Sequence, residues 1–124
     1  MTFQEDPTRS QIITQVLEAR KKKAEFLAQM RQRQQEGWKV ARCCARILKE
    51  EFKVRRVVLF GSMLNHEEMS PQSDIDLAVW DLPEEDLWKA GAAIERGHDF
   101  SVDLVEVQKA KPHILKAIEK GREL

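Results

Sequence analysis

The chain has 124 residues, of which 42% are hydrophobic and 34% are charged. This composition predicts one globular domain with a modest core and excludes a disordered chain. No run of about 18 apolar residues occurs, which excludes a membrane-spanning helix. The net charge is zero, yet residues 1–60 hold 14 Lys/Arg against 7 Asp/Glu, and residues 61–124 hold 7 against 14. The amino-terminal half is therefore basic and can contact nucleic acid or an acidic partner, or it can simply be solvated.

The first 52 residues predict two helices. Asp6 and Pro7 are typical of a helix start, and neither glycine nor proline follows until Gly37, where we place a break. The first helix would reach roughly 43 Å, so we expect part of it to project from the domain or to lie on another chain. The second helix buries one face, which comprises Trp38, Ala41, Cys44, Ala45, Leu48 and Phe52.

The rest of the chain predicts alternating strands and helices. Strands are expected at 54–60, 74–80 and 100–107, and helices at about 83–96 and 112–120. The segment 61–73 is too short for a crossover helix, so the first two strands should be antiparallel. We therefore predict an α/β fold with a small mixed sheet of about three strands, flanking helices and a long N-terminal helical extension. Residues 1–36 form this extension, and residues 37–124 form the domain.

Three aspartates are the candidate metal-binding and catalytic residues. Asp74 and Asp76 are two positions apart on a predicted strand, so their side chains leave one face of the sheet. Asp103 lies within the next strand and joins them if the two strands are neighbours. Oxygen ligands of this kind suit Mg²⁺ or Mn²⁺, and a carboxylate cluster around two such ions promotes phosphoryl or nucleotidyl transfer. A solvated sheet face, or a strand-end cap in the case of Asp103, is the alternative interpretation.

Gly61 and Ser62 end the first strand and are the candidate nucleotide-binding residues. A glycine there permits a tight turn, and free amides with a serine hydroxyl can bind phosphate oxygens. Trp80 shares the face of the aspartates and can lie near a nucleotide, whereas Trp38 and Trp88 are expected in the core. Cys43 and Cys44 are adjacent on a helix, so we expect reduced thiols with structural roles in a cytoplasmic protein.

The combination of these motifs resembles the DNA polymerase β-like nucleotidyltransferase superfamily. Leu-Phe-Gly-Ser is followed after eleven residues by Asp-Ile-Asp-Leu-Ala-Val and later by Val-Asp-Leu-Val, and the resemblance covers about residues 38–124. It implies a nucleotidyltransferase fold in which Gly61 and Ser62 bind a nucleoside triphosphate such as ATP. It also implies that Asp74, Asp76 and Asp103 hold Mg²⁺ or Mn²⁺.

The small size is similar to that of the minimal nucleotidyltransferases, which are often antitoxins paired with HEPN-domain toxins. This resemblance implies transfer of AMP from ATP to a HEPN-type RNase toxin, within a hetero-oligomer and without a membrane. Two alternatives stay open. The protein can be a non-catalytic antitoxin that neutralises its toxin by binding, or it can bind nucleic acid through the basic helix around Arg20–Lys23.

Overall fold

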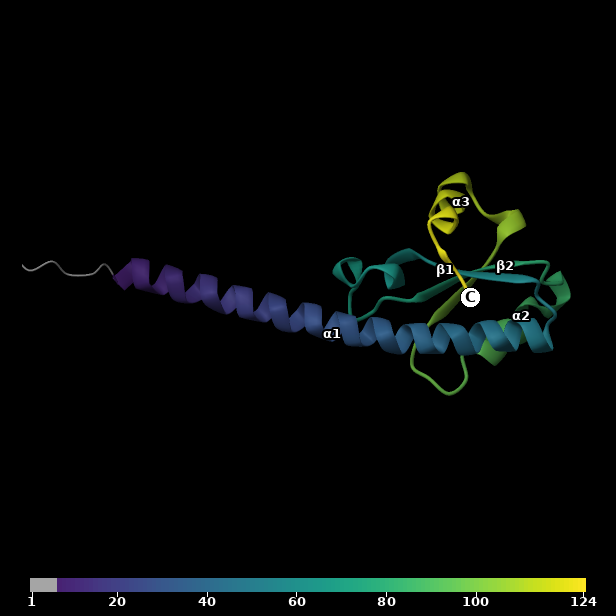
Figure 1. Ribbon diagram of the computed structural model, residues 1–124, viewed down its shortest axis with the longest axis horizontal. Helices are drawn as coiled ribbons and strands as arrows, with labels where there is room; N and C mark the ends of the chain where they lie inside the picture. The colour runs from purple at the N-terminus through teal and green to yellow at the C-terminus, as the bar shows by residue number, and fades with distance from the viewer. Residues whose placement is uncertain (1–6) are drawn as a thin grey trace, which may run out of the picture.

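A mixed sheet lies at the centre of the domain, and one long helix runs along it and beyond it (Figure 1). This is a computed structural model, and it describes residues 7–124. The strands are β1 (Arg56–Phe60), β2 (Ile75–Trp80), β3 (Val102–Glu106) and β4 (Arg122–Glu123), in the spatial order β3-β2-β1-β4. β1 is antiparallel to β2 and β4, and β2 is parallel to β3. The predicted α/β class and the antiparallel first pair are confirmed, and β4 is an additional strand.

The long helix α1 is continuous from Pro7 to Glu51, so the prediction of two helices separated at Gly37 is wrong. Gly37 is buried, and a methyl group there would lie 2.5 Å from Sδ of Met63. The glycine therefore permits close packing against the turn after β1, and it does not end the helix. The predicted cap Asp6 lies outside the described residues. The division of the chain after residue 36 stays a prediction, since α1 crosses that position without a break.

The two halves of α1 have different environments. Residues 8–29 contain no buried side chain, and Met30 is the first one that the domain covers. Figure 1 shows this first half extending away from the sheet, as the sequence predicted. Despite its length, α1 is not apolar enough to cross a membrane, and neither is any other helix in residues 7–124.

The sheet has two covered faces, because successive side chains of a strand point to opposite sides. One face packs on the second half of α1 and on α2 (Leu87–Ile94), and it carries the larger core. The members of this core from the three main strands are Val57, Leu59, Ile75, Leu77, Val79 and Val102. The opposite face packs on α3 (Pro112–Glu119) through Val58, Phe60, Ala78 and Ile118. Asp76 belongs to this second face, because it is two residues from Ala78 on β2.

The expectation for the two cysteines is confirmed in part. Both are free, and Cys44 is buried, with Sγ 3.3 Å from the carbonyl oxygen of Ile94. Burial raises the pKa of the Cys44 thiol to about 11, which keeps it protonated and unreactive. Cys43 is exposed and therefore has no structural role in the core.

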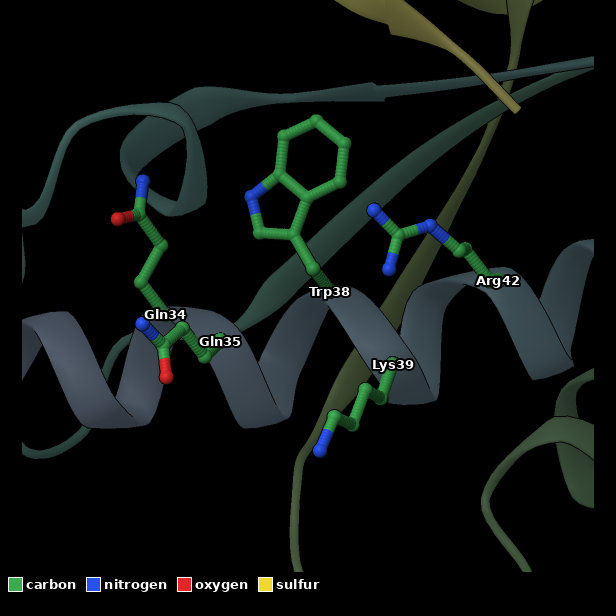
Figure 2. Close-up of a pocket in the computed structure, with 5 residues that line it drawn as sticks. All are labelled: Gln34, Gln35, Trp38, Lys39 and Arg42. Carbon is green, nitrogen blue, oxygen red and sulfur yellow. The ribbon is translucent and has the colours of Figure 1, made fainter.

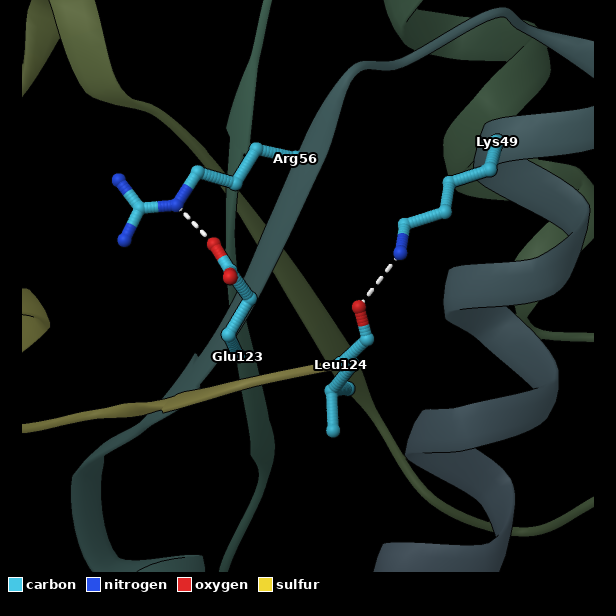
Figure 3. A network of polar contacts seen from close by, with 4 residues as sticks. All are labelled: Lys49, Arg56, Glu123 and Leu124. Carbon is cyan, nitrogen blue, oxygen red and sulfur yellow. Dashed lines mark hydrogen bonds and ion pairs between the residues drawn. The ribbon is translucent and has the colours of Figure 1, made fainter.

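The short strand β4 was not predicted, because two residues carry no periodicity. It pairs with Val58 and Leu59 of β1, and the Leu124 amide donates a hydrogen bond to the Val57 carbonyl at 3.0 Å. Figure 3 shows two further contacts: Arg56 forms an ion pair with Glu123, and Lys49 of α1 donates to the Leu124 carbonyl at 2.5 Å. These contacts tie the last residues both to the sheet and to α1.

Gly121 makes the pairing of β4 possible, and Gly121→Ala is expected to lower the free energy of unfolding by about 3 kcal/mol. A methyl group there would lie 2.5 Å from Cγ1 of Val58 and 2.6 Å from the Leu59 carbonyl oxygen, and the backbone cannot move aside cheaply. The measurement is urea denaturation at pH 7. Gly91→Ala is the control, since no atom lies within 4 Å and helix propensity should add up to about 1 kcal/mol. An unchanged midpoint for Gly121→Ala would contradict the packing described here.

Candidate functional site

The three predicted aspartates lie together where β2 and β3 begin. Asp76 and Asp103 are direct register partners on these two parallel strands, so the condition for Asp103 to join the pair is met. Asp74 comes just before β2 and is two positions from Asp76. Asp74 and Asp76 are partly buried, and Asp103 is exposed.

The three carboxylates influence one another electrostatically. Burial, the negative charges of Asp103 and Asp74, and a side-chain hydrogen bond with Asp103 raise the pKa of Asp76 to about 6. Within residues 7–124, no lysine or arginine forms a salt bridge with any of the three. The cluster therefore concentrates negative charge that a bound cation would neutralise.

The turn with Gly61 and Ser62 lies directly against this cluster. Phe60 is paired with Asp76, and the chain then enters the 3₁₀ turn Gly61–Leu64. Gly61 has φ +84°, and a methyl group on it would lie 2.5 Å from Oδ2 of Asp76. Glycine suits this left-handed backbone, and any side chain here would displace the Asp76 carboxylate. A phosphate bound by the amides of this turn would consequently lie beside Asp76.

Helix α1 supports the turn through contacts that the sequence did not predict. Gln34 Nε2 and Trp38 Nε1 both donate hydrogen bonds to the Met63 carbonyl, at 3.0 and 3.1 Å. Figure 2 shows these two side chains extending from α1, at a surface pocket that Gln35, Lys39 and Arg42 also line. Trp38 was expected in the core and is partly buried there, but its polar contact was not foreseen.

A second contact from α1 holds the other end of the loop. Arg33 Nη2 donates to the Ser73 carbonyl at 3.0 Å, one residue before Asp74. Gln34, Trp38 and Arg33 are thus positioning residues for the segment between the two motifs. No local signal marks them, because their partners lie 25 to 40 residues further along the chain.

Of the other two tryptophans, Trp80 lies on the predicted face of the sheet, whereas Trp88 is not in the core. Trp80 shares the face of Asp76 but lies four residues further along β2, roughly 13 Å away. There it pairs with Arg56, whose guanidinium carbon is 4.4 Å from the ring centre. Trp88 was expected in the core, yet 88% of it is exposed. The buried residues of α2 are Ala90 and Ile94, and Trp88 is two residues before Ala90, which places it on the opposite side of the helix.

The chemistry of the donor set fits Mg²⁺ or Mn²⁺, since all three candidate ligands are carboxylates. Within residues 7–124, no three His, Cys, Asp or Glu side chains already converge as a ready metal-binding group. Asp76 and Asp103 would separate to receive a cation, and rotation of the exposed Asp103 side chain permits this.

A mixed sheet with a glycine-serine turn packed against paired aspartates defines a nucleotidyltransferase fold. The family described as "Polymerase beta, Nucleotidyltransferase" matches residues 43–124, and the chain belongs to this family. The superfamily prediction is confirmed, and nucleotidyl transfer is the general function that such a domain supports. Searches of curated proteins and of solved structures found no match.

Proposed function

We propose that the protein transfers AMP from ATP, with Mg²⁺ or Mn²⁺, to a hydroxyl group of a protein acceptor. The acceptor in this proposal is a HEPN-type RNase toxin, which the modification inactivates, so that the chain acts as an antitoxin. The observation that carries the proposal is the contact between Gly61 and the Asp76 carboxylate. It supports the proposal because the Gly61–Ser62 turn lies next to Asp76, and nucleotidyl transfer needs a phosphate-binding turn beside a carboxylate cluster.

Each site residue has a defined role in this proposal. Asp74, Asp76 and Asp103 would hold the metal, which when bound neutralises triphosphate charge and activates the acceptor hydroxyl. The amides of the Gly61–Leu64 turn and the Ser62 hydroxyl donate hydrogen bonds to phosphate oxygens. Gln34 and Trp38 keep these amides in place through the Met63 carbonyl.

The transfer itself requires one bond to form and one to break. The acceptor hydroxyl oxygen forms a bond to the α-phosphorus of ATP, and the bond from that phosphorus to the bridging α–β oxygen breaks. Pyrophosphate leaves with the electron pair, and the hydroxyl proton passes to the carboxylate of Asp103. Asp103 is exposed, so an acceptor protein can reach it.

Two features support a separate protein as the acceptor. The chain contains no tyrosine, so it cannot modify itself on that residue. Its small size is also similar to that of the minimal nucleotidyltransferases whose partners are HEPN toxins. The toxin, ATP and the metal are the ligands of this proposal, and the complex with the toxin is a hetero-oligomer.

The test is transfer of label from α-phosphate-labelled ATP, with Mg²⁺, to proteins in a lysate of the source cell. We expect one labelled band, which mass spectrometry identifies as a HEPN protein carrying AMP. The Asp74→Asn, Asp76→Asn double variant should lose the band. Asp81→Asn is the matched control, because Asp81 lies at the far end of β2 beside Arg55 and should keep it. If the wild type labels nothing with Mg²⁺ or Mn²⁺ and any nucleotide, the binding interpretation replaces catalysis.

A further inference from the structure

The projecting half of α1 carries an apolar surface that nothing in the domain covers. Ile12, Ile13, Val16 and Leu17 are 54%, 50%, 44% and 58% exposed and occupy less than two helical turns. We call these four residues the stripe. Most helical stability in proteins comes from packing of an apolar face, and a cluster of exposed aliphatic side chains marks a contact site. The stripe therefore points to a partner surface.

A second uncovered apolar surface lies on α2. Trp88 is 88% exposed and lines a hollow of about 460 Å³ together with Leu87, Gly91, Ala92 and Leu104. A methyl group built on Gly91 would have no neighbour within 4 Å, so the floor of this hollow is open to an approaching helix. An exposed tryptophan beside small residues is typical of the centre of a protein interface.

The charges around the two surfaces are complementary. Residues 8–29, which carry the stripe, contain five Lys/Arg and two Asp/Glu, and four of the basic residues form the run Arg20–Lys23. Residues 84–99, which include α2, contain five Asp/Glu and two Lys/Arg. Opposite potentials of this kind favour association of the two surfaces and set its orientation.

The chain cannot join these surfaces to each other within one copy. The stripe is centred near residue 15, whereas α2 meets α1 at Cys44, whose Sγ contacts the Ile94 carbonyl oxygen at 3.3 Å. Along the axis of α1, residue 15 and Cys44 are roughly 44 Å apart. Their midpoint falls at residues 29–30, where α1 enters the domain at Met30. A two-fold axis at that point would bring each stripe to the level of α2 in the other copy.

We propose that the protein is a two-fold homodimer in which the stripe of each copy packs on α2 of the other, against Trp88. The two α1 helices then run antiparallel about residues 29–30. Each copy supplies one stripe and one hollow, so a two-fold dimer contains two identical stripe–hollow contacts. Neither surface is then left exposed, and no further copy can add. The basic run Arg20–Lys23 follows the stripe and faces the acidic flanks of the other α2.

Light scattering coupled to size exclusion, at micromolar concentration, is the first test. The wild type should be a dimer, and Leu17→Asp and Trp88→Asp should each be monomers. Both residues are exposed, so these variants should keep the circular dichroism of the folded chain. Gln11→Asp is the matched control, because Gln11 is also exposed and, at 100° per residue, points away from all four residues of the stripe. A monomeric wild type, or a dimer that both variants keep, overturns the proposal.

Cross-linking identifies which surfaces meet. In a Cys43→Ser background, Leu17→Cys on one chain and Trp88→Cys on another are mixed and oxidised. We expect a disulfide-linked dimer from the mixture. Cross-linking of Leu17→Cys chains to each other, without the mixed product, would show pairing of the stripes instead and would overturn the proposal. So would a monomer whose basic helix binds duplex DNA with a steep salt dependence.

Discussion

Asp76→Asn is expected to be more stable than the wild type at pH 7 and to lose nucleotidyl transfer by at least about 1,000-fold. The loss of activity follows from removal of a metal-binding carboxylate at the centre of the proposed site. The gain in stability follows from the raised pKa of Asp76. Because this pKa is about 6 in the folded protein and about 4 in an unfolded chain, ionisation of Asp76 opposes folding.

The sign of this effect depends on pH. Below about pH 4 Asp76 is protonated in both states and carries no penalty. Stability then decreases as the pH rises through 6, since only the unfolded chain has already released the proton. A pKa rise from about 4 to about 6 corresponds to at most about 3 kcal/mol, and partial exposure reduces this to about 1–2 kcal/mol.

Urea denaturation of both proteins from pH 4 to pH 8 measures the effect. The two midpoints should coincide near pH 4, separate between pH 4 and pH 6, and stay apart above pH 6, with the variant higher. Addition of Mg²⁺ at pH 7.5 should raise the wild-type midpoint more than that of Asp76→Asn, because the cation neutralises the cluster. The control Asp81→Asn should show no such pH-dependent gap. A wild type more stable than Asp76→Asn at pH 7 would contradict this account of the cluster.

Gly61→Ala is expected to reduce transfer at least about 100-fold and to destabilise the protein by about 2–3 kcal/mol. Two effects combine at this position. The left-handed backbone, with φ +84°, disfavours any side chain by about 1–2 kcal/mol, and the added methyl group would lie 2.5 Å from Oδ2 of Asp76. Relief of the contact would move the turn away from the carboxylates or rotate Asp76, and either movement separates the two parts of the site.

Gly97→Ala is a matched control for the backbone effect alone. Gly97 has φ +85°, and a methyl group on it would meet nothing within 4 Å. The free energy of unfolding of Gly97→Ala should therefore be lower by about 1–2 kcal/mol, and its nucleotidyl transfer should be unchanged. The transfer assay with α-phosphate-labelled ATP, together with urea denaturation, separates the two contributions. Equal losses of stability and of transfer in the two variants would show that contact with Asp76 contributes to neither.

The local pattern of the sequence determined three of the strands and the two shorter α-helices. Short-range periodicity predicts β1, β2, β3, α2 and α3. A half-buried strand repeats its apolar side chains every two residues, and an amphipathic helix repeats them every three or four. Residue type at particular positions identified the candidate site. A glycine-serine pair at the end of a strand and aspartates on neighbouring strands are unusual without a function. These residues are Gly61, Ser62, Asp74, Asp76 and Asp103.

Only the tertiary structure decided which of these elements meet. β4 is two residues long and exists because Gly121 allows it to approach β1. The sequence predicted a helix break at Gly37, but this glycine packs against the turn at Met63 inside a continuous helix. The sequence also predicted Trp88 in the core, but the side chain is exposed on α2. The hydrogen bonds from Gln34 and Trp38 join residues that are 25 or more positions apart. Contacts between residues so far apart in the sequence depend on how the helix packs on the sheet. No local pattern in the sequence predicts them.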